Sequence, residues 1–160
     1  AGVGYYALHM ALRSQAKHIH ACEINPDSIV GLRWARNTNG LNKKITIHQG
    51  DNQETLPTLY GQADRCHLGL LPSSEAVWMH ALGCLKPKGG WVHIHMNLHK
   101  DELEQWQSAT LETLKKYAIL HGRNWEITVA HLELVKWFSP HVRHVVLDVK
   151  CSEVHLEERA

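Results

Sequence analysis

The sequence predicts an α/β fold, in which a mostly parallel sheet ends in an antiparallel hairpin. Segments of strand type alternate with segments of helix type over residues 1–120, which is typical of a parallel sheet covered by helices on both faces. Two further strand segments then follow each other with no helix between them, so they must pair differently. Hydrophobic residues make up 44% of the 160, which is enough for a substantial core.

The first half of the chain is expected to hold two helices and two short strands. In order, these are a helix over residues 5–14, a strand over 18–23, a helix over 25–39 and a strand over 45–49. Tyr5, Leu8 and Leu12 recur at helical spacing and are expected to form the apolar side of the first helix. The second helix begins with Asn25 as N-cap and Pro26 at its first position.

The second half is expected to hold longer elements. In order, we expect a strand over residues 64–71, a helix over 74–85, a strand over 91–96, a helix over 101–120 and two strands over 125–137 and 144–150. The long helix has its apolar side at Leu103, Trp106, Leu111 and Leu114. Because Ser139-Pro140-His141 alone joins the last two segments, they are predicted to form the antiparallel ending of the sheet.

The first four residues, Ala1-Gly2-Val3-Gly4, predict a glycine turn. A Gly-x-Gly turn of this type normally follows a buried strand and opens a helix, since glycine lets the backbone turn tightly beneath a ligand. We therefore expect the sequence to be a fragment of its domain, cut just after the first strand of the sheet. With no internal boundary visible, residues 1–160 are predicted to form one domain truncated at its N-terminus.

Composition excludes several classes of protein. A net charge of +1 with 21% charged residues excludes a disordered acidic chain and a strongly basic nucleic-acid arm. No apolar run approaches the roughly 20 residues that span a bilayer. Cys22, Cys66, Cys84 and Cys151 lie far apart in apolar stretches and predict buried free thiols in a reducing cytoplasm. The fourteen histidines are scattered, so no metal site is expected.

Candidate ligand-binding residues follow three successive strands of the expected sheet, where open α/β sheets bind ligands. Backbone N–H groups around Gly2 and Gly4, at the start of a helix, suit an anionic group. This turn also fits a dinucleotide site or a turn without a ligand. Glu23 lies nineteen residues after Gly4, where a carboxylate can accept both hydroxyls of a ribose, although an isolated Glu is usually a solvated surface charge.

Asp51 and Asn52 follow the third strand of the expected sheet. An acidic side chain there can accept a hydrogen bond from an adenine amino group, while a backbone N–H meets the ring nitrogen. This pair favours S-adenosylmethionine (SAM) over a nicotinamide dinucleotide, whose second half would lie elsewhere. The alternative is a turn-forming Asp-Asn pair without a ligand.

The segment after the fourth strand, residues 68–75, is expected to face the transferable group of such a ligand. Pro72 fixes the φ angle of the backbone at its position. Ser73, Ser74 or nearby carbonyls can hydrogen-bond a target base. Pro72 and Ser73 are thus candidates to face the target, while no general base is identified. A serine that caps the following helix is the alternative for Ser73 and Ser74.

Seven motifs together carry a resemblance to a known family. They are Ala1–Tyr6, Ala21–Pro26, Gly50-Asp51-Asn52, Asp64-Arg65, Leu68–Glu75, His93-Ile94-His95 and Pro140–Asp148. With these the chain resembles the family of tRNA wybutosine-synthesizing protein 2 over nearly its whole length. That family comprises tRNA aminocarboxypropyltransferases of the class I SAM-dependent transferase superfamily, related to the tRNA guanine-N1 methyltransferases. The resemblance implies the Rossmann-like fold of that superfamily.

The resemblance also implies an activity. The family transfers the 3-amino-3-carboxypropyl group of SAM to carbon-7 of 4-demethylwyosine at position 37 of phenylalanine tRNA, without a metal. Its methyltransferase relatives carry Asn-Leu-Pro after the fourth strand, whereas this chain has Leu70-Leu71-Pro72 with Gly69 before it. This departure favours aminocarboxypropyl transfer over the nearest alternative, guanine-N1 methylation. A second alternative is a SAM-binding or RNA-binding module without catalysis.

Phenylalanine tRNA is the partner that the resemblance implies. The family recognises tRNA mainly through upstream regions, which this chain is expected to lack. The basic pairs Lys43-Lys44, Lys86/Lys88 and Lys115-Lys116 are interpreted as solvated faces, because affinity for a polyanion usually needs clustered cations.

Overall fold

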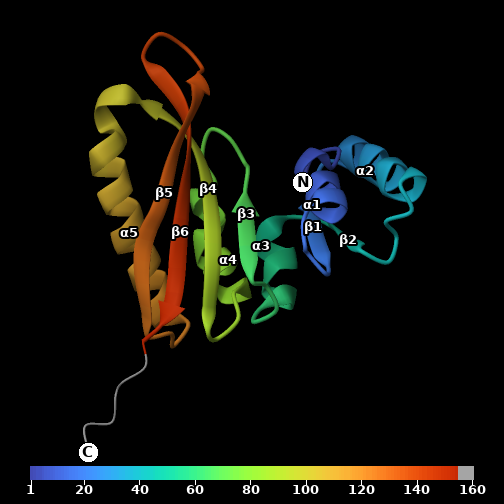
Figure 1. Ribbon diagram of the computed structural model, residues 1–160, viewed down its shortest axis with the longest axis horizontal. Helices are drawn as coiled ribbons and strands as arrows, with labels where there is room; N and C mark the ends of the chain where they lie inside the picture. The colour runs from blue at the N-terminus through green and yellow to red at the C-terminus, as the bar shows by residue number, and fades with distance from the viewer. Residues whose placement is uncertain (155–160) are drawn as a thin grey trace, which may run out of the picture. The chain divides into compact units, whose positions relative to one another are not determined.

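A computed structural model describes residues 1–154 of the chain, which form two compact units, residues 1–58 and 59–154. Each unit has its own sheet, coloured blue to teal in the first unit and green to red in the second (Figure 1). No helix among the described residues is long and apolar enough to cross a membrane.

The first unit is a two-stranded parallel sheet with helices packed on it. Its elements are α1 (Tyr5–Arg13), β1 (Ile19–Glu23), α2 (Pro26–Thr38), β2 (Ile45–Gln49) and α3 (Asn52–Thr55). The register of β1 and β2 runs from Ile19↔Ile45 to Glu23↔Gln49, so both strands end at the same edge. These elements confirm the predicted strand–helix alternation.

Helix α1 turns a different face inward from the one predicted. Ala7 and Ala11 are buried in the core of the first unit beside Leu32, whereas Tyr5 and Leu12 are exposed. The small alanine side chains allow the helix to pack closely on the sheet, and the large apolar residues are left at its margins. Of the three residues predicted to form the apolar side of α1, only Leu8 is partly buried against the core.

Helix α2 begins as its sequence predicts. The Oδ1 atom of Asn25 accepts hydrogen bonds from the backbone N–H groups of Asp27 and Ser28, at 2.9 and 3.3 Å. Pro26 occupies the first helical position, where it forfeits no intrahelical hydrogen bond.

The second unit holds a four-stranded sheet in the order β3-β4-β6-β5. Its elements are η1 (Leu56–Leu59, at the boundary), β3 (Arg65–Leu68), η2 (Glu75–Val77), α4 (Trp78–Cys84), β4 (Gly89–His99), η3 (Lys100–Glu102), α5 (Leu103–Leu120), β5 (Trp125–Trp137) and β6 (Val142–Glu153). Strands β3 and β4 are parallel, and β6 pairs antiparallel with both β4 and β5. The predicted antiparallel hairpin at the end of a parallel sheet is confirmed.

Several boundaries in this unit differ from the predicted ones, most of all at β3, β4 and β6. Strand β3 ends at Leu68, because Gly69–Leu71 leaves the sheet as an exposed segment. Strand β4 continues to His99 and β6 begins at Val142, since these two residues pair with each other at the end of an eleven-residue ladder. Pairing between β4 and β6 extends both strands beyond the apolar runs that mark them in the sequence.

One face of the four-stranded sheet is apolar and covered by α4 and α5 (Figure 1). Val92 and Ile94 of β4 pair with Val149 and Leu147 of β6, and none of these four side chains is exposed. Leu114 of α5 is equally buried. The core of the second unit therefore lies between the sheet and its two helices.

Strand β5 contains two bulges. Its register with β6 shifts between Val129 and His131 and again between Leu134 and Lys136. In each case one extra residue of β5 has no counterpart in β6, which allows thirteen residues of β5 to pair with a shorter stretch of β6. The first bulge lies near the middle of β5 and the second lies nearer the turn.

The four cysteines are free thiols, as predicted. Cys84 and Cys151 are buried, and burial raises the pKa of Cys151 to about 12, which keeps this thiol protonated. Cys22 and Cys66 are only partly buried, so the prediction of full burial was wrong for these two.

Candidate functional site

The glycine turn before α1 adopts a backbone conformation that requires glycine. Gly2 and Gly4 have φ angles of 57° and 96°, in the left-handed region that side chains disfavour. A Cβ atom on Gly4 would lie 2.5 Å from Cδ1 of the buried Leu32. The carbonyl of Gly4 accepts the backbone N–H of Leu8 at 2.8 Å and so starts α1. The turn is therefore fixed both by its dihedrals and by close packing on α2.

Glu23, at the end of β1, is the residue that ties this turn to the sheet. Its Oε2 atom accepts the backbone N–H of Gly2 at 2.6 Å and the α-amino group of Ala1 at 2.8 Å. Its Oε1 atom accepts the backbone N–H groups of Ile24 and Asn25, at 3.0 and 2.8 Å. The carboxylate is thus surrounded by donors and only 13% exposed.

These donors determine the charge of Glu23. Burial opposes the charged form, but the hydrogen bonds that the carboxylate accepts, among them those from the backbone N–H groups of Asn25 and Gly2, outweigh it. The pKa of Glu23 is therefore lowered. Glu23 is a fixed anion with four hydrogen-bond donors on its two oxygens. Because a carboxylate has about four acceptor positions, a ribose that binds it through two hydroxyls would replace some of these donors.

Asp51 and Asn52 lie at the same edge of the two-stranded sheet as Glu23. The backbone N–H of Gly50 donates to the carbonyl of Glu23 at 3.0 Å, which joins the ends of β1 and β2. Asp51 then caps the short helix α3, its Oδ1 accepting the N–H of Gln53 at 2.8 Å. Asn52 is the first residue of α3. Asp51 therefore has a local structural role as a helix cap, where the sequence offered a turn-forming Asp-Asn pair as the alternative to ligand binding.

The first unit thus brings together all five of the predicted cofactor-binding residues. They lie at one edge of its sheet, and they are Gly2, Gly4, Glu23, Asp51 and Asn52. The arrangement offers a carboxylate at the end of each parallel strand and a glycine turn beside the first. Such a site suits a neutral polar ligand with hydroxyl and amino donors, such as a nucleoside.

The segment with the two target-facing candidates lies in the second unit. Pro72 is exposed, and its carbonyl accepts the backbone N–H of Asn97 at 3.0 Å, which ties the segment to β4. The hydroxyl of Ser73 accepts the N–H of Glu75 at 3.2 Å. This oxygen therefore takes part in the start of η2, and the hydroxyl hydrogen remains a possible donor to a ligand.

Ser74 has a structural role instead of facing a target. It is 1% exposed, and its Oγ atom accepts the indole Nε1–H of Trp78 at 3.0 Å. The alternative that the Ser74 side chain caps the next helix was wrong, because it makes no capping hydrogen bond to η2. Asn97, which fixes Pro72, was missed, because a backbone N–H bond leaves no signal in the side-chain pattern.

A second polar cluster lies on the four-stranded sheet. Nδ1 of His93 is 2.6 Å from Oδ1 of Asp148, and Nε2 of His93 is 3.2 Å from the guanidinium of Arg65. His95 and His144 are buried and joined by a 3.0 Å hydrogen bond. Among the residues described, no group of three or more His, Cys, Asp or Glu side chains is arranged to hold a metal ion. These histidines form side-chain pairs within the sheet.

Comparison with protein families gives one clear match. A family model described as "TRM5/TYW2 methyltransferase domain" matches residues 1–126. The Arabidopsis thaliana protein "tRNA wybutosine-synthesizing protein 2/3/4" is 43% identical over 151 residues, which cover 94% of this chain and 15% of that protein. The Danio rerio "tRNA wybutosine-synthesizing protein 2 homolog" is 35% identical over 183 residues, covering 95% and 44%. The chain spans less than half the length of these two relatives.

A solved structure resembles the chain over most of its length. The crystal structure of M. jannaschii TYW2 in complex with AdoMet has a TM-score of 0.82 and 27% sequence identity. The match covers 96% of this chain and 66% of that one. This likeness confirms the fold class predicted from the sequence.

Proposed function

The chain belongs to the family of TRM5/TYW2 methyltransferase domains, and on this premise we propose that it is a catalytic domain that binds SAM and modifies tRNA. The reaction proposed is transfer of the 3-amino-3-carboxypropyl group of SAM to carbon-7 of 4-demethylwyosine at position 37 of phenylalanine tRNA. The names of the plant and fish relatives and the AdoMet bound to M. jannaschii TYW2 support this proposal. Residues 1–160 are proposed to act as one domain.

The edge of the first unit carries the proposal for SAM. Glu23 would accept the ribose hydroxyls, and Asp51 would accept the adenine amino group while the backbone N–H of Asn52 meets the ring. The turn at Gly2 and Gly4 would lie beneath the ligand. The observation that supports these roles best is the placement of both carboxylates at one edge, joined by the bond from Gly50 to Glu23. Glu23 stays ionised at neutral pH, as such a role requires.

The chemistry proposed needs positioning more than activation. The sulfonium sulfur of SAM makes each of its attached carbons electrophilic, so the carbon held in line with the nucleophile reacts. Carbon-7 of the base forms a bond to the aminocarboxypropyl chain as that chain's bond to sulfur breaks. The electron pair stays on sulfur, giving 5′-methylthioadenosine, and carbon-7 loses a proton. Pro72 and Ser73 are proposed to face the target base.

Methyl transfer to guanine-N1 of tRNA is the second candidate, because the matching family model covers both branches. The sequence Gly69-Leu70-Leu71-Pro72, which lacks the Asn-Leu-Pro of the methyltransferases, favours the aminocarboxypropyl branch. A non-catalytic SAM-binding or RNA-binding module is the remaining alternative.

One experiment separates these three functions. The natural full-length protein is titrated with SAM by calorimetry, then incubated with SAM and tRNA containing 4-demethylwyosine or guanosine at position 37. Mass spectrometry of the nucleoside at position 37 is expected to show the aminocarboxypropyl adduct on 4-demethylwyosine. A methyl adduct on guanosine would assign the protein to the other branch, and no adduct on either would leave a binding module.

A further inference from the structure

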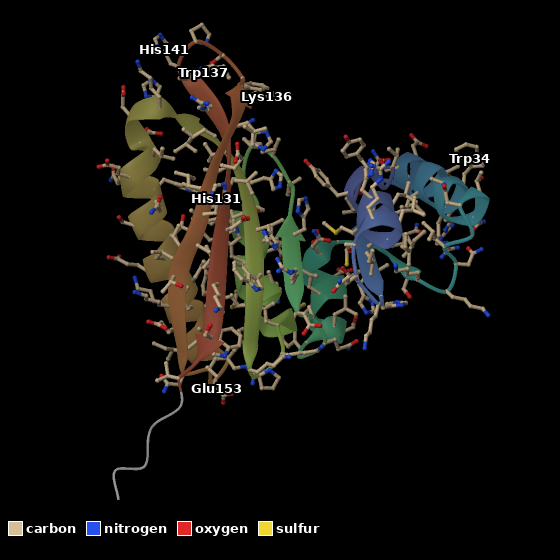
Figure 2. All side chains as sticks on the ribbon, in the orientation of Figure 1. Trp34, His131, Lys136, Trp137, His141 and Glu153 are labelled. Carbon is tan, nitrogen blue, oxygen red and sulfur yellow. The ribbon has the colours of Figure 1, made fainter. Side chains whose placement is uncertain are left out.

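The turn of the β5–β6 hairpin carries exposed aromatic rings and positive charges that the proposed function does not use. We call residues 136–143 the hairpin tip; Figure 2 shows Lys136, Trp137 and His141 at this end of the hairpin. Trp137 is 51% exposed and Phe138 is 69% exposed. Residues 134–144 include Lys136 and Arg143 but no Asp or Glu. Trp137 and Phe138 are neighbours in the chain, and exposed large apolar side chains that adjoin one another are typical of interaction sites.

The hairpin tip holds these side chains in a defined arrangement. The guanidinium of Arg143 lies over the Trp137 ring, 4.9 Å from its centre, and donates to the carbonyl of Leu134 at 3.1 Å. The turn is closed by the N–H of Phe138, which donates to the carbonyl of Val142 at 2.9 Å. A small hollow of about 140 Å³ lies against Trp137 and is lined on its other side by Leu98 and Leu103, among others. A partner would therefore meet a preformed surface.

The charges around the hairpin tip favour an anionic partner. Lys136, and Lys100 of η3, have no carboxylate within ion-pair distance among residues 1–154. Lys100 is tied to the hairpin tip by its backbone N–H, which donates to the carbonyl of His141 at 2.9 Å. Asp101 and Glu102 follow Lys100 in the chain, and Oδ2 of Asp101 lies 3.4 Å from Nδ1 of His99. The two lysines remain available to phosphates.

The hairpin tip lies at the same end of the four-stranded sheet as the target-facing segment. Asn97, whose N–H binds the carbonyl of Pro72, is paired with His144 of β6, and His144 is paired with Lys136 of β5. Two inter-strand steps of about 4.8 Å each therefore separate Asn97 from Lys136. A nucleotide chain with one base at Pro72 can reach the hairpin tip with the bases that flank it.

We propose that the hairpin tip is a stacking surface for unpaired RNA bases that flank the modified nucleotide. Trp137 and Phe138 offer ring faces to two bases, while Lys136 and Lys100 contact the phosphates. Stacking on aromatic rings next to cations suits single strands, because every base has a π-face, and it excludes duplex RNA, whose bases are already stacked. The inference rests on the proposed function for the identity of the RNA.

The test measures RNA binding by the natural full-length protein with fluorescence anisotropy. The probes are a fluorescein-labelled RNA stem-loop with a seven-nucleotide loop and a blunt RNA duplex of equal length. The variants are Trp137→Ala/Phe138→Ala, Trp137→Tyr, and Trp34→Ala as a matched control. Trp34 of α2 is 70% exposed and belongs to the other unit (Figure 2). SAM titration of every variant reports on folding and on the cofactor site.

The double variant is expected to weaken stem-loop binding about tenfold or more, with little change for the duplex or for SAM. Trp137→Tyr, which keeps a ring, is expected to stay within about threefold of the natural protein, and Trp34→Ala within about twofold. Equal stem-loop affinity of the double variant and the natural protein would overturn the inference, as would an equal loss in Trp34→Ala. The inference would also fail if the natural protein were a dimer and the double variant a monomer with unchanged RNA affinity, since the hairpin tip would then join two copies.

The same measurements separate this inference from the proposed function. If the natural protein binds the stem-loop through Trp137 and Phe138 but modifies no nucleotide at position 37, the stacking surface stands and the proposed reaction fails. If the natural protein modifies position 37 and the double variant modifies it with the same KM for tRNA, the reaction stands and the stacking surface is refuted.

Discussion

The two ends of strand β5 carry the same residue type in opposite surroundings. Trp125, at the start of the strand, is 8% exposed, and its Nε1–H donates to the carbonyl of Pro87 at 2.8 Å. Trp137, at the other end, is 51% exposed and touches the guanidinium of Arg143. The apolar surface of Trp125 is buried and its indole N–H is hydrogen-bonded within the chain, whereas about half of Trp137 is exposed. The difference teaches that the neighbours of a residue, more than its type, decide whether it supports the fold or faces a partner.

The largest expected effect tests this contrast directly. Trp125→Ala should lower the free energy of unfolding by about 3–5 kcal/mol, because it leaves a cavity and an unpaired Pro87 carbonyl. Trp137→Ala should lower it by less than about 1 kcal/mol, since mainly one exposed cation–π contact is lost. Urea denaturation of the natural full-length protein followed by circular dichroism measures both. Similar losses at the two positions would show that the exposed end also stabilises the fold.

The glycine turn allows the same comparison between neighbouring residues. Gly4→Ala should cost about 3 kcal/mol of stability, because its Cβ meets Leu32 in addition to the strain of a positive φ. Gly2→Ala adds a Cβ with no atom within 4 Å and should cost about 1 kcal/mol. Thermal unfolding of both variants provides the measurement. If Gly2→Ala is the more harmful, the turn is not fixed by packing on α2.

Two glutamates give a matched pair for ligand binding. Glu23→Ala should weaken SAM binding by about 1.5–3 kcal/mol, since charge-assisted hydrogen bonds to the ligand are lost. Glu75→Ala removes an exposed carboxylate of η2 and should leave the dissociation constant within about twofold. Calorimetric titration of the full-length variants with SAM compares them. Equal affinities would refute the ribose role proposed for Glu23.

The partly buried His67 predicts a smaller, pH-dependent effect. Burial lowers the pKa of His67 to about 4, and His95 and His93 add to this while Asp148 opposes it. As the pH falls, His67 binds a proton near pH 6.5 in the unfolded chain but only near pH 4 in the folded chain. Stability is therefore full above that pH and falls as the pH drops from about 6.5 to 4, by on the order of 1–2 kcal/mol because the ring is not fully buried.

The matched variant for this prediction is His67→Gln, which keeps polar atoms but does not titrate. Urea denaturation of the natural protein and the variant at several pH values isolates the contribution of His67. The difference in stability between them should change with pH in this interval, and a constant difference would contradict the lowered pKa.

Much of the fold could be predicted because local signals and tertiary contacts agree. The bounds of β5 are those of its apolar and β-branched segment, Trp125–Trp137, and Asn25 with Pro26 marks the start of α2. The buried face of α1 could not be predicted in the same way. Ala7 and Ala11 have smaller side chains than Tyr5 and Leu12, and only the close packing of the helix on its sheet selects them.

The candidate site was predictable to a similar extent. The positions of Glu23 and Asp51 follow from strand ends and spacing, and the structure places both at one edge of a sheet. The sequence could not show that Glu23 is surrounded by backbone N–H groups, nor that Ser74 is buried against Trp78. Such bonds depend on the path of the backbone, which leaves no trace in residue spacing. The ligand roles of these residues stay predictions.

The two bulges of β5 make the length of the hairpin adjustable at two places. Residues paired across neighbouring strands point to the same face, and the extra residue of each bulge, Ala130 or Val135, has no counterpart in β6. Loss of either residue would therefore remove a bulge while Trp137 stays paired with Arg143 and keeps its face. Loss of one residue within a regularly paired stretch would instead shift the register and turn Trp137 to the opposite face. Homologous hairpins should therefore differ in length at the two bulges more readily than elsewhere along β5.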